Sequence, residues 1–139
     1  MAYHVTEITK GIIGEWSKVI EEIEEYRDAL LQECKIMAII ELSDLYGAID
    51  AYLYNENTNF EEYSSEYIIK YTKTITEVSS FDLIALIYAL EHIKIKNEKL
   101  AELYVSLDVY LKTHYRLNIL DLKTMSLITK RAFDTGSRT

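Results

Sequence analysis

The chain contains no proline and only four glycines in 139 residues, so very few positions interrupt a helix. Apolar side chains recur every three or four positions near its start, at Trp16, Val19, Ile23, Tyr26 and Leu30. This spacing is typical of a helix with one buried face. With 49% hydrophobic residues the chain can form a core, and its length suits one domain. We therefore expect a single all-α domain over residues 1–139.

The expected architecture is a helical bundle built on an antiparallel helix hairpin over residues 6–54, with additional helices over 59–135. The first helix is predicted from about Thr6 to Gln32, and the second from about Lys35 to Tyr54, with a turn near Glu33. Further helices are predicted over 59–78, 81–96, 98–115 and 119–136, with N-caps at Asn59, at Ser79 or Ser80, and at Asn118. The segment 81–96 is apolar on nearly every side, which predicts a buried helix.

One internal similarity links the two halves of the chain. The segments ELSDLYGAIDAYL (41–53) and KLAELYVSLDVYL (99–111) are identical at six of thirteen positions. A degenerate second hairpin would explain this match, and so would chance similarity between two amphipathic helices rich in Leu and Tyr. In the second segment Lys99 and Glu102 stand where the first has Glu41 and Asp44.

The net charge of −8 argues against nucleic acid as a partner, because an acidic chain repels a phosphate backbone. The single cysteine, Cys34, cannot form an intrachain disulfide and fits a reducing compartment. The first residues lack the pattern of a signal peptide, and no apolar run approaches the roughly 20 residues of a membrane span. These features predict a cytoplasmic protein without a membrane partner.

Four carboxylates in the predicted hairpin are placed symmetrically about its turn. Glu22 and Glu25 lie three residues apart on the first helix, and Glu41 and Asp44 do the same on the second. Each pair therefore shares one helix face. Glu22 and Asp44 are equally distant in sequence from Glu33, as are Glu25 and Glu41. In an antiparallel hairpin the two pairs lie level with each other.

The second pair is expected to face the core, because Glu41 and Asp44 fall among apolar positions of their helix. The exposed side of that helix is expected to carry Ser43 and Asp50. Glu22 lies at the edge of the first helix's apolar stripe, with Glu25 just beyond. An unpaired charge directed at the core costs several kcal/mol or shifts its pKa. The other acidic residues of the first helix, Glu21, Glu24 and Asp28, point away from this stripe and are expected to be solvated.

Nearby cations are too few to neutralise this cluster, since Lys18 reaches one carboxylate and Arg27 projects elsewhere. Four converging carboxylates are the hard oxygen ligands that Mg²⁺ prefers, and Mn²⁺ can substitute. The pattern therefore predicts a metal site formed by Glu22, Glu25, Glu41 and Asp44. The alternative is a hairpin whose acidic pairs are matched by more distant Lys or Arg residues. His4, His92 and His114 are scattered along the chain and suggest no histidine-rich metal site.

These residues resemble a known family. EEIEE (21–25) followed by ELSD (41–44) matches the EExxE…ExxD pattern of the MazG-like, all-α nucleoside triphosphate pyrophosphohydrolases, which include the dimeric dUTPases. The resemblance covers residues 12–54, and TKRAFDTGSR (129–138) also resembles the end of small phage-borne members. Within the first motif, Glu24 stands where glycine is common in the family. About 60 residues separate the hairpin from that tail, more than compact members carry.

The resemblance implies an Mg²⁺-dependent enzyme that converts a (d)NTP to the monophosphate and pyrophosphate. It maps the metal ligands onto Glu22, Glu25, Glu41 and Asp44, with Glu21 completing the motif. Compact members complete their bundle with a second subunit, which implies a homo-oligomer, a dimer or a tetramer. The degenerate repeat could instead supply that partner within one chain.

Candidate roles follow for the remaining polar residues. Glu25 or Glu21, at the edge of the cluster, could accept a proton from the attacking water. The cations considered for the triphosphate are Lys18, Lys130, Arg131 and Arg138, although surface Lys and Arg residues are common. Trp16 could stack on a base, but a role in the core is the stronger interpretation. A nucleotide-binding bundle that is catalytically inactive or regulatory, or a helical interaction protein with structural acid pairs, would show the same hairpin.

Overall fold

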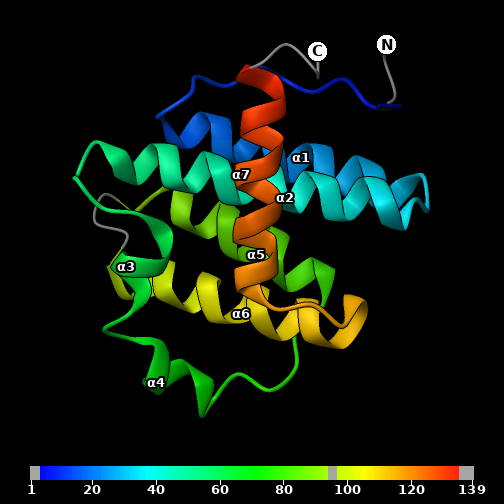
Figure 1. The fold of residues 1–139 in the computed structure, drawn as a ribbon. Helices are drawn as coiled ribbons and strands as arrows, with labels where there is room; N and C mark the ends of the chain where they lie inside the picture. The colour runs from blue at the N-terminus through cyan, green and yellow to red at the C-terminus, as the bar shows by residue number, and fades with distance from the viewer. Residues whose placement is uncertain (1–3, 94–96, 135–139) are drawn as a thin grey trace.

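The structure is a computed structural model that describes residues 4–93 and 97–134. Figure 1 shows its seven helices: α1 (Trp16–Leu31), α2 (Lys35–Tyr54), α3 (Phe60–Ser64), α4 (Ile68–Thr72), α5 (Ser80–Glu91), α6 (Asn97–Tyr115) and α7 (Ile119–Asp134). The part of the chain so described contains no strand, which confirms the all-α prediction. None of these helices is long and apolar enough to cross a membrane.

Helices α1 and α2 form the predicted antiparallel hairpin, and its turn lies at the predicted position. Glu33 has a positive φ of 55°, and the amide of Cys34 donates to the carbonyl of Ala29 to close the turn. Val19, Ile23 and Tyr26 of α1 are fully buried together with the leucines of α2. The apolar spacing of the sequence therefore becomes the contact surface of the hairpin.

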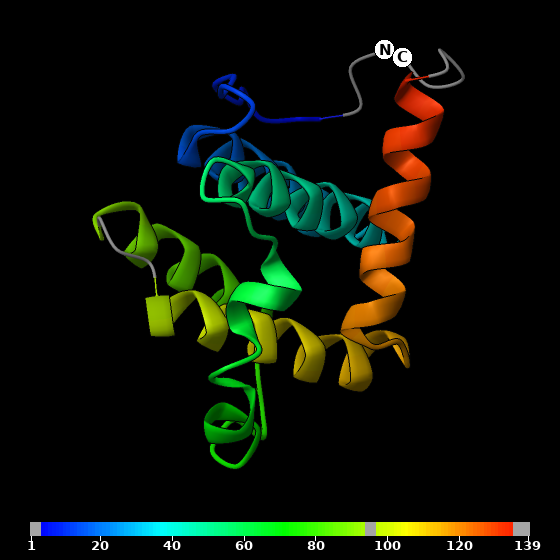
Figure 2. The same cartoon turned by 60° about the vertical axis from the view of Figure 1, so that its left-hand side comes forward.

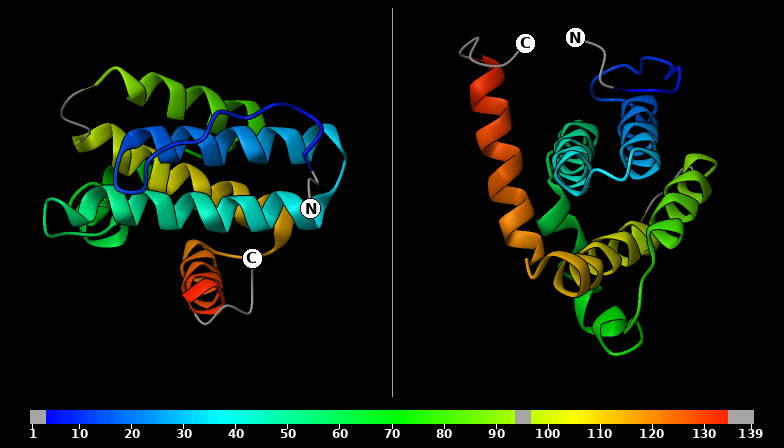
Figure 3. Two further views of the ribbon diagram at one scale, coloured as in Figure 1. Left: turned by 90° about the horizontal axis from the view of Figure 1, so that it is seen from above. Right: turned by 90° about the vertical axis from the view of Figure 1, so that its right-hand side faces the viewer.

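The first helix begins ten residues later than predicted, at Trp16, and residues 4–15 form an arm that runs along the hairpin (Figure 3). Thr6 does not cap a helix, because its hydroxyl and its amide both donate to Asp28. Two glycines allow the chain to turn into α1. A Cβ on Gly11 would lie 2.3 Å from the carbonyl oxygen of Ser17, and Gly14 has a φ of +91°.

The single helix predicted over 59–78 is wrong beyond its first turn. Asn59 caps α3 as predicted, by accepting from the amide of Glu62, but α3 ends at Ser64 and α4 ends at Thr72. After α3 a side-chain hydroxyl takes the place of a helical amide as donor, because the hydroxyl of Ser65 donates to the carbonyl of Glu62. Side chains of this kind compete with the helical hydrogen-bond ladder, so they weaken a long helix.

The caps predicted for the last helices are confirmed. Ser79 and Asp82 form a reciprocal capping box at α5, and Asn118 and Asp121 exchange the same two hydrogen bonds at α7. The predicted burial of the whole α5 segment is wrong, because Phe81 is 76% exposed and only one face of the helix packs on the core. The predicted end of α7 near Gly136 lies outside the described residues.

The two halves of the bundle exchange their third helices. α1 and α2 are followed by α3, which packs on α6, whereas α5 and α6 are followed by α7, which packs on α2 (Figure 2). α1 also packs on α5, so the first helices of the two halves contact each other as well. This arrangement favours a degenerate repeat over chance similarity.

Matching residues in the two similar segments make matching contacts. Asp50 Oδ1 accepts from the amide of Phe60, and Asp108 Oδ1 accepts from the amide of Ile119, both at 2.9 Å. Each aspartate thereby supports the first turn of the helix that follows. Where the first half carries its inward acidic pair, the second half carries an ion pair between Lys99 and Glu102, at 3.8 Å. The second segment therefore shares this packing contact with the first and lacks the carboxylate cluster.

Helix α7 covers a side of α2 that was predicted to be exposed. The side of α2 opposite the carboxylates was expected to be exposed, yet Ser43 is buried and donates to the carbonyl of Ile40. α7 crosses α2 on this side (Figures 1 and 2). The sequence of α2 has apolar residues on all sides, which is consistent with a helix buried between α1 and α7.

Candidate metal centre

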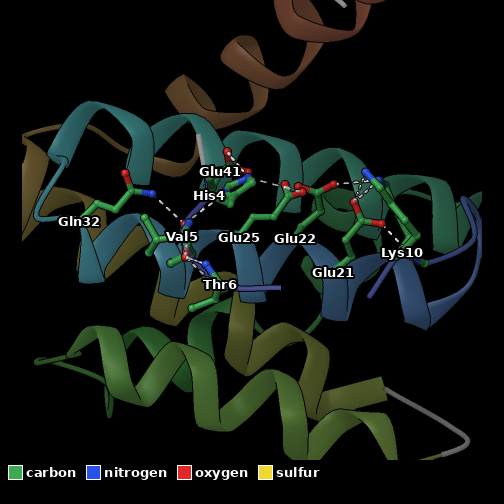
Figure 4. Close-up of polar contacts among 12 residues, drawn as sticks. His4, Val5, Thr6, Lys10, Glu21, Glu22, Glu25, Gln32 and Glu41 are labelled. Carbon is green, nitrogen blue, oxygen red and sulfur yellow. Dashed lines mark hydrogen bonds and ion pairs between the residues drawn. The ribbon is translucent and has the colours of Figure 1, made fainter. Parts of the chain in front are cut away.

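The level register of the hairpin brings the four predicted carboxylates together. Glu22 and Glu25 of α1 and Glu41 and Asp44 of α2 each offer an oxygen, and these oxygens all lie within 4.8 Å of one another. Figure 4 shows Glu22, Glu25 and Glu41 converging between the two helices. We refer to these four residues as the carboxylate cluster.

Much of the carboxylate cluster is removed from water. Glu22 is 5% exposed and Glu41 is fully buried, whereas Glu25 and Asp44 are half-buried at the edge. The Oε2 atom of Glu22 is buried and has no hydrogen-bond partner among the described residues. A buried carboxylate oxygen without a partner is costly, and coordination of a cation would satisfy it.

Burial and mutual repulsion make two of these groups unusually weak acids. Burial, with the neighbouring charge of Glu25, raises the pKa of Glu22 to about 8. Burial, with the hydrogen bond and charge of Glu41, raises the pKa of Glu25 to about 7. The protein therefore accumulates negative charge here only at a free-energy cost, which a bound cation would remove.

Lys18 is the nearest lysine, and it bridges Glu21 Oε2 at 3.0 Å and Glu22 Oε1 at 3.1 Å. Burial lowers the pKa of Lys18, but its hydrogen bond to Glu21 and the charge of Glu22 outweigh that effect and raise the pKa overall. One ammonium group shared between two carboxylates cannot neutralise the cluster. An all-oxygen donor set in this arrangement can hold a metal ion.

The structure places Glu21 beside the cluster and not in it. Glu21 is buried, contrary to the expectation that it would be solvated, and it accepts from the amide of Gly11 at 2.7 Å. Burial raises the pKa of Glu21, but the Gly11 and Lys18 hydrogen bonds outweigh it and hold the pKa below its usual range. Glu21 is therefore an ionised anchor for the arm and for Lys18.

Asp28 was also expected to be a solvated charge, and this is wrong. It is 1% exposed and accepts from the amides of Val5 and Thr6 and from the side chain of Gln32 (Figure 4). These hydrogen bonds outweigh burial and hold the pKa of Asp28 well below its usual range. The burial of Asp28 could not be predicted while residues 6–15 were expected to be helical, because it is the non-helical arm that covers Asp28.

Glu24 departs less from the expectation. It is half-buried, accepts a hydrogen bond from the hydroxyl of Tyr88 on α5, and lies 3.9 Å from Arg27. It does not belong to the carboxylate cluster.

His4 reaches the site although its position in the sequence gave no indication of this. Its Nε2 atom lies 3.7 Å from Glu25 Oε1 and 4.0 Å from Glu41 Oε1. The three histidines are not gathered into one site, but His4 alone lies beside the carboxylate cluster, because the arm folds back over the hairpin. His4 lies outside both acidic motifs and at no helical spacing from them, so no pattern in the sequence connects it with the carboxylate cluster.

The predicted substrate contacts are brought together only in part. Lys18 lies at the cluster, but Trp16 is buried, packs edge-on against Tyr52 at 5.1 Å and donates to the carbonyl of Ile87. Trp16 is thus a core residue, in agreement with the stronger of the two interpretations of its role. Lys130 is exposed on α7. Arg131 is on α7 without a described side chain, and Arg138 lies outside the described residues.

Comparison of the chain with protein-family models, with curated proteins and with solved structures found no match. The geometry of the carboxylate cluster and the motif that contains it are therefore the basis for a functional proposal.

Proposed function

We propose that this protein is an Mg²⁺-dependent pyrophosphohydrolase that converts a nucleoside triphosphate, (d)NTP, to the monophosphate and pyrophosphate. The observation that carries the proposal is the convergence of Glu22, Glu25, Glu41 and Asp44 within 4.8 Å. The order EExxE…ExxD of these residues resembles that of the MazG-like enzymes. Mn²⁺ would substitute for Mg²⁺, because both ions favour carboxylate oxygens.

Binding of a triphosphate to an acidic protein requires a cation, since the net charge of −8 opposes it. Mg²⁺ bound at the cluster would supply a Lewis acid that offsets phosphate charge. Glu41, fully buried, and Glu22, held by Lys18, would provide the rigid part of the ligand set. Asp44 and Glu25 are less buried, so a phosphate would reach the cluster most easily at these two residues.

Glu25 is the better candidate for accepting the proton of the attacking water. Glu25 lies at the less buried edge of the cluster, whereas Glu21 is held by the amide of Gly11 and by Lys18. Glu21 instead positions Lys18. Lys18 in turn supplies the nearest ammonium group for a phosphate oxygen, while Lys130, Arg131 and Arg138 of the C-terminal region remain candidates for the same role.

The proposal includes a cytoplasmic location and assembly into a dimer or tetramer. Helix α7 supports assembly, because Leu120, Leu127 and Ile128 are exposed on it and offer a second copy of the chain an apolar surface. The preference for one base and one sugar would be set by a pocket for the nucleoside, which is separate from the carboxylate cluster.

The direct test is incubation of the protein with each (d)NTP and Mg²⁺, with products identified by ³¹P NMR. We expect pyrophosphate and a monophosphate from at least one nucleotide, and no product with EDTA. The matched control is Glu66→Gln, which removes one charge from an exposed position and should retain full activity. Release of inorganic phosphate and a diphosphate, or no turnover of any nucleotide, would refute the proposal.

A further inference from the structure

The arm that precedes α1 places a histidine against two members of the carboxylate cluster. His4 Nε2 lies 3.7 Å from Glu25 Oε1 and 4.0 Å from Glu41 Oε1, and each of the three residues offers a ligand atom within 4.8 Å of the other two. Both separations exceed the length of a hydrogen bond. Two ligand atoms that each lie about 2.1 Å from one ion can be at most about 4.2 Å apart, so both separations are short enough for a shared ion. The three atoms can therefore surround a cation.

The other ring nitrogen of His4 is held by a buried carboxylate. His4 Nδ1 lies 3.0 Å from Asp28 Oδ2, and the remaining acceptor sites of Asp28 receive the amides of Val5 and Thr6 and the side chain of Gln32 (Figure 4). Asp28 has only acceptors, so Nδ1 is the protonated nitrogen. In the neutral tautomer the lone pair is therefore on Nε2, the nitrogen that lies near Glu25 and Glu41. Histidine ligands of metal ions are oriented by a carboxylate in this way.

We propose that His4, Glu25 and Glu41 form a second cation site, beside the four-carboxylate site and sharing Glu25 and Glu41 with it. Glu41 has two oxygens and can bind one ion through each. Glu25 can bind both ions through one oxygen, which leaves its other oxygen to accept the proton of the attacking water. An imidazole nitrogen suits Mn²⁺, Co²⁺ or Zn²⁺, whereas Mg²⁺ prefers oxygen ligands only. The second site therefore takes a transition-metal ion in preference to Mg²⁺. This inference rests on the proposed metal centre, because it uses two of its carboxylates.

A different role for His4 would give the opposite result. If the ring were a protonated counterion that neutralises Glu25 and Glu41, it would compete with metal ions, and its removal would strengthen their binding. If it is a ligand, its removal weakens the binding of Co²⁺ and leaves the all-oxygen site intact. The sign of the change in affinity distinguishes the two roles.

The experiment is a Co²⁺ titration of the full chain, followed by visible absorption and by calorimetry, for the wild type, His4→Ala and His4→Gln. The control is His92→Ala, which removes a histidine that is 84% exposed. We expect two Co²⁺ ions per wild-type and His92→Ala chain. After either His4 substitution we expect one Co²⁺ ion per chain. The affinity for a second Co²⁺ ion should fall at least tenfold. Mg²⁺ affinity should change less than threefold.

Circular dichroism melting of each ion-free variant reports whether the substitution disturbs the fold, and His4→Gln keeps a polar group of similar size at the arm. Unchanged Co²⁺ stoichiometry and affinity in folded His4 variants would overturn the inference, and so would tighter binding. Mg²⁺ binding and nucleotide hydrolysis by the wild type separate this failure from failure of the proposed function. If the wild type binds Mg²⁺ and hydrolyses a nucleotide while the His4 variants bind Co²⁺ normally, only the second site is wrong.

Discussion

Replacement of Glu22 by glutamine should stabilise the ion-free protein while it removes metal binding. Burial and the charge of Glu25 raise the pKa of Glu22 from 4.5 to about 8, so between these values the folded state holds a proton that the unfolded state has lost. The free energy of unfolding contributed by this group therefore falls as pH rises from about 4.5 to about 8. Glutamine has nearly the same shape and carries no charge, so the cost of ionising a buried group beside Glu25 is removed.

The gain in the free energy of unfolding depends on how far the pH of the measurement lies above the ordinary pKa of the carboxyl, which is 4.5. At pH 7 this difference is 2.5 units, and each unit corresponds to about 1.36 kcal/mol, so the gain is at most about 3 kcal/mol. Since the amide also loses the contact of Glu22 with Lys18, we expect a net gain of about 1–3 kcal/mol. For a chain of this size this corresponds to a melting temperature higher by roughly 3–10 °C.

The assay is urea unfolding in EDTA at pH 5, 7 and 8, for the wild type, Glu22→Gln and the charge-matched Glu66→Gln. The advantage of Glu22→Gln should grow from pH 5 to pH 8, whereas Glu66→Gln should follow the wild type. Added Mn²⁺ should stabilise the wild type and have little effect on Glu22→Gln. A Glu22→Gln protein less stable than the wild type in EDTA at pH 7 would show that this carboxylate is a structural ion-pair member.

Three further predictions concern other parts of the molecule. Glu41→Gln and Asp44→Asn should each reduce nucleotide hydrolysis at least about 100-fold and leave the ion-free protein as stable or more stable; strong loss of ion-free stability would instead indicate structural acid pairs. Asp28→Ala should lower the free energy of unfolding at pH 7 by about 2–4 kcal/mol in urea, because amides of the arm lose a buried acceptor. Because the pKa of Asp28 is lowered, this contribution is present above pH 3.8 and is lost as pH falls further, so a variant equally stable at pH 7 would contradict the role. Asn59→Ala and Asn118→Ala should each cost about 1 kcal/mol in thermal melting, and no change would show that these caps are dispensable.

The hairpin and its four carboxylates could be predicted from the sequence because both depend on local periodicity. The 3–4 apolar spacing sets which face of each helix is buried, and equal distances from Glu33 place Glu22 level with Asp44. The caps at Asn59, Ser79 and Asn118 were equally local. Each of these features needs only a few neighbouring residues.

The arm and its contacts could not be predicted, because they join residues far apart in the chain. Thr6 has the sequence signature of a helix cap, yet its donors bond to Asp28, 22 residues away. Once Gly11 and Gly14 turn the chain back along α1, Asp28 becomes buried and His4 reaches Glu25. A helical projection of α1 alone contains no information about a segment that covers it.

The burial of Trp16 and Ser43 likewise depends on helices that come later in the chain. Trp16 bonds to α5 through Ile87, and α7 packs on the side of α2 that carries Ser43. Packing of α1 on α5 determines the first contact, and the exchange of third helices, which places α7 on α2, determines the second. A pairwise match of two segments specifies neither arrangement.

Binding of a divalent metal by the carboxylate cluster is the claim on which the proposed chemistry depends. Crystals of the full chain grown with Mn²⁺, measured near the manganese absorption edge, would locate the ion by its anomalous scattering. We predict a peak between α1 and α2 at about 2.0–2.3 Å from oxygens of Glu22, Glu25, Glu41 and Asp44. An ordered cluster with these side chains in place and no anomalous peak among them at saturating Mn²⁺ would contradict the account.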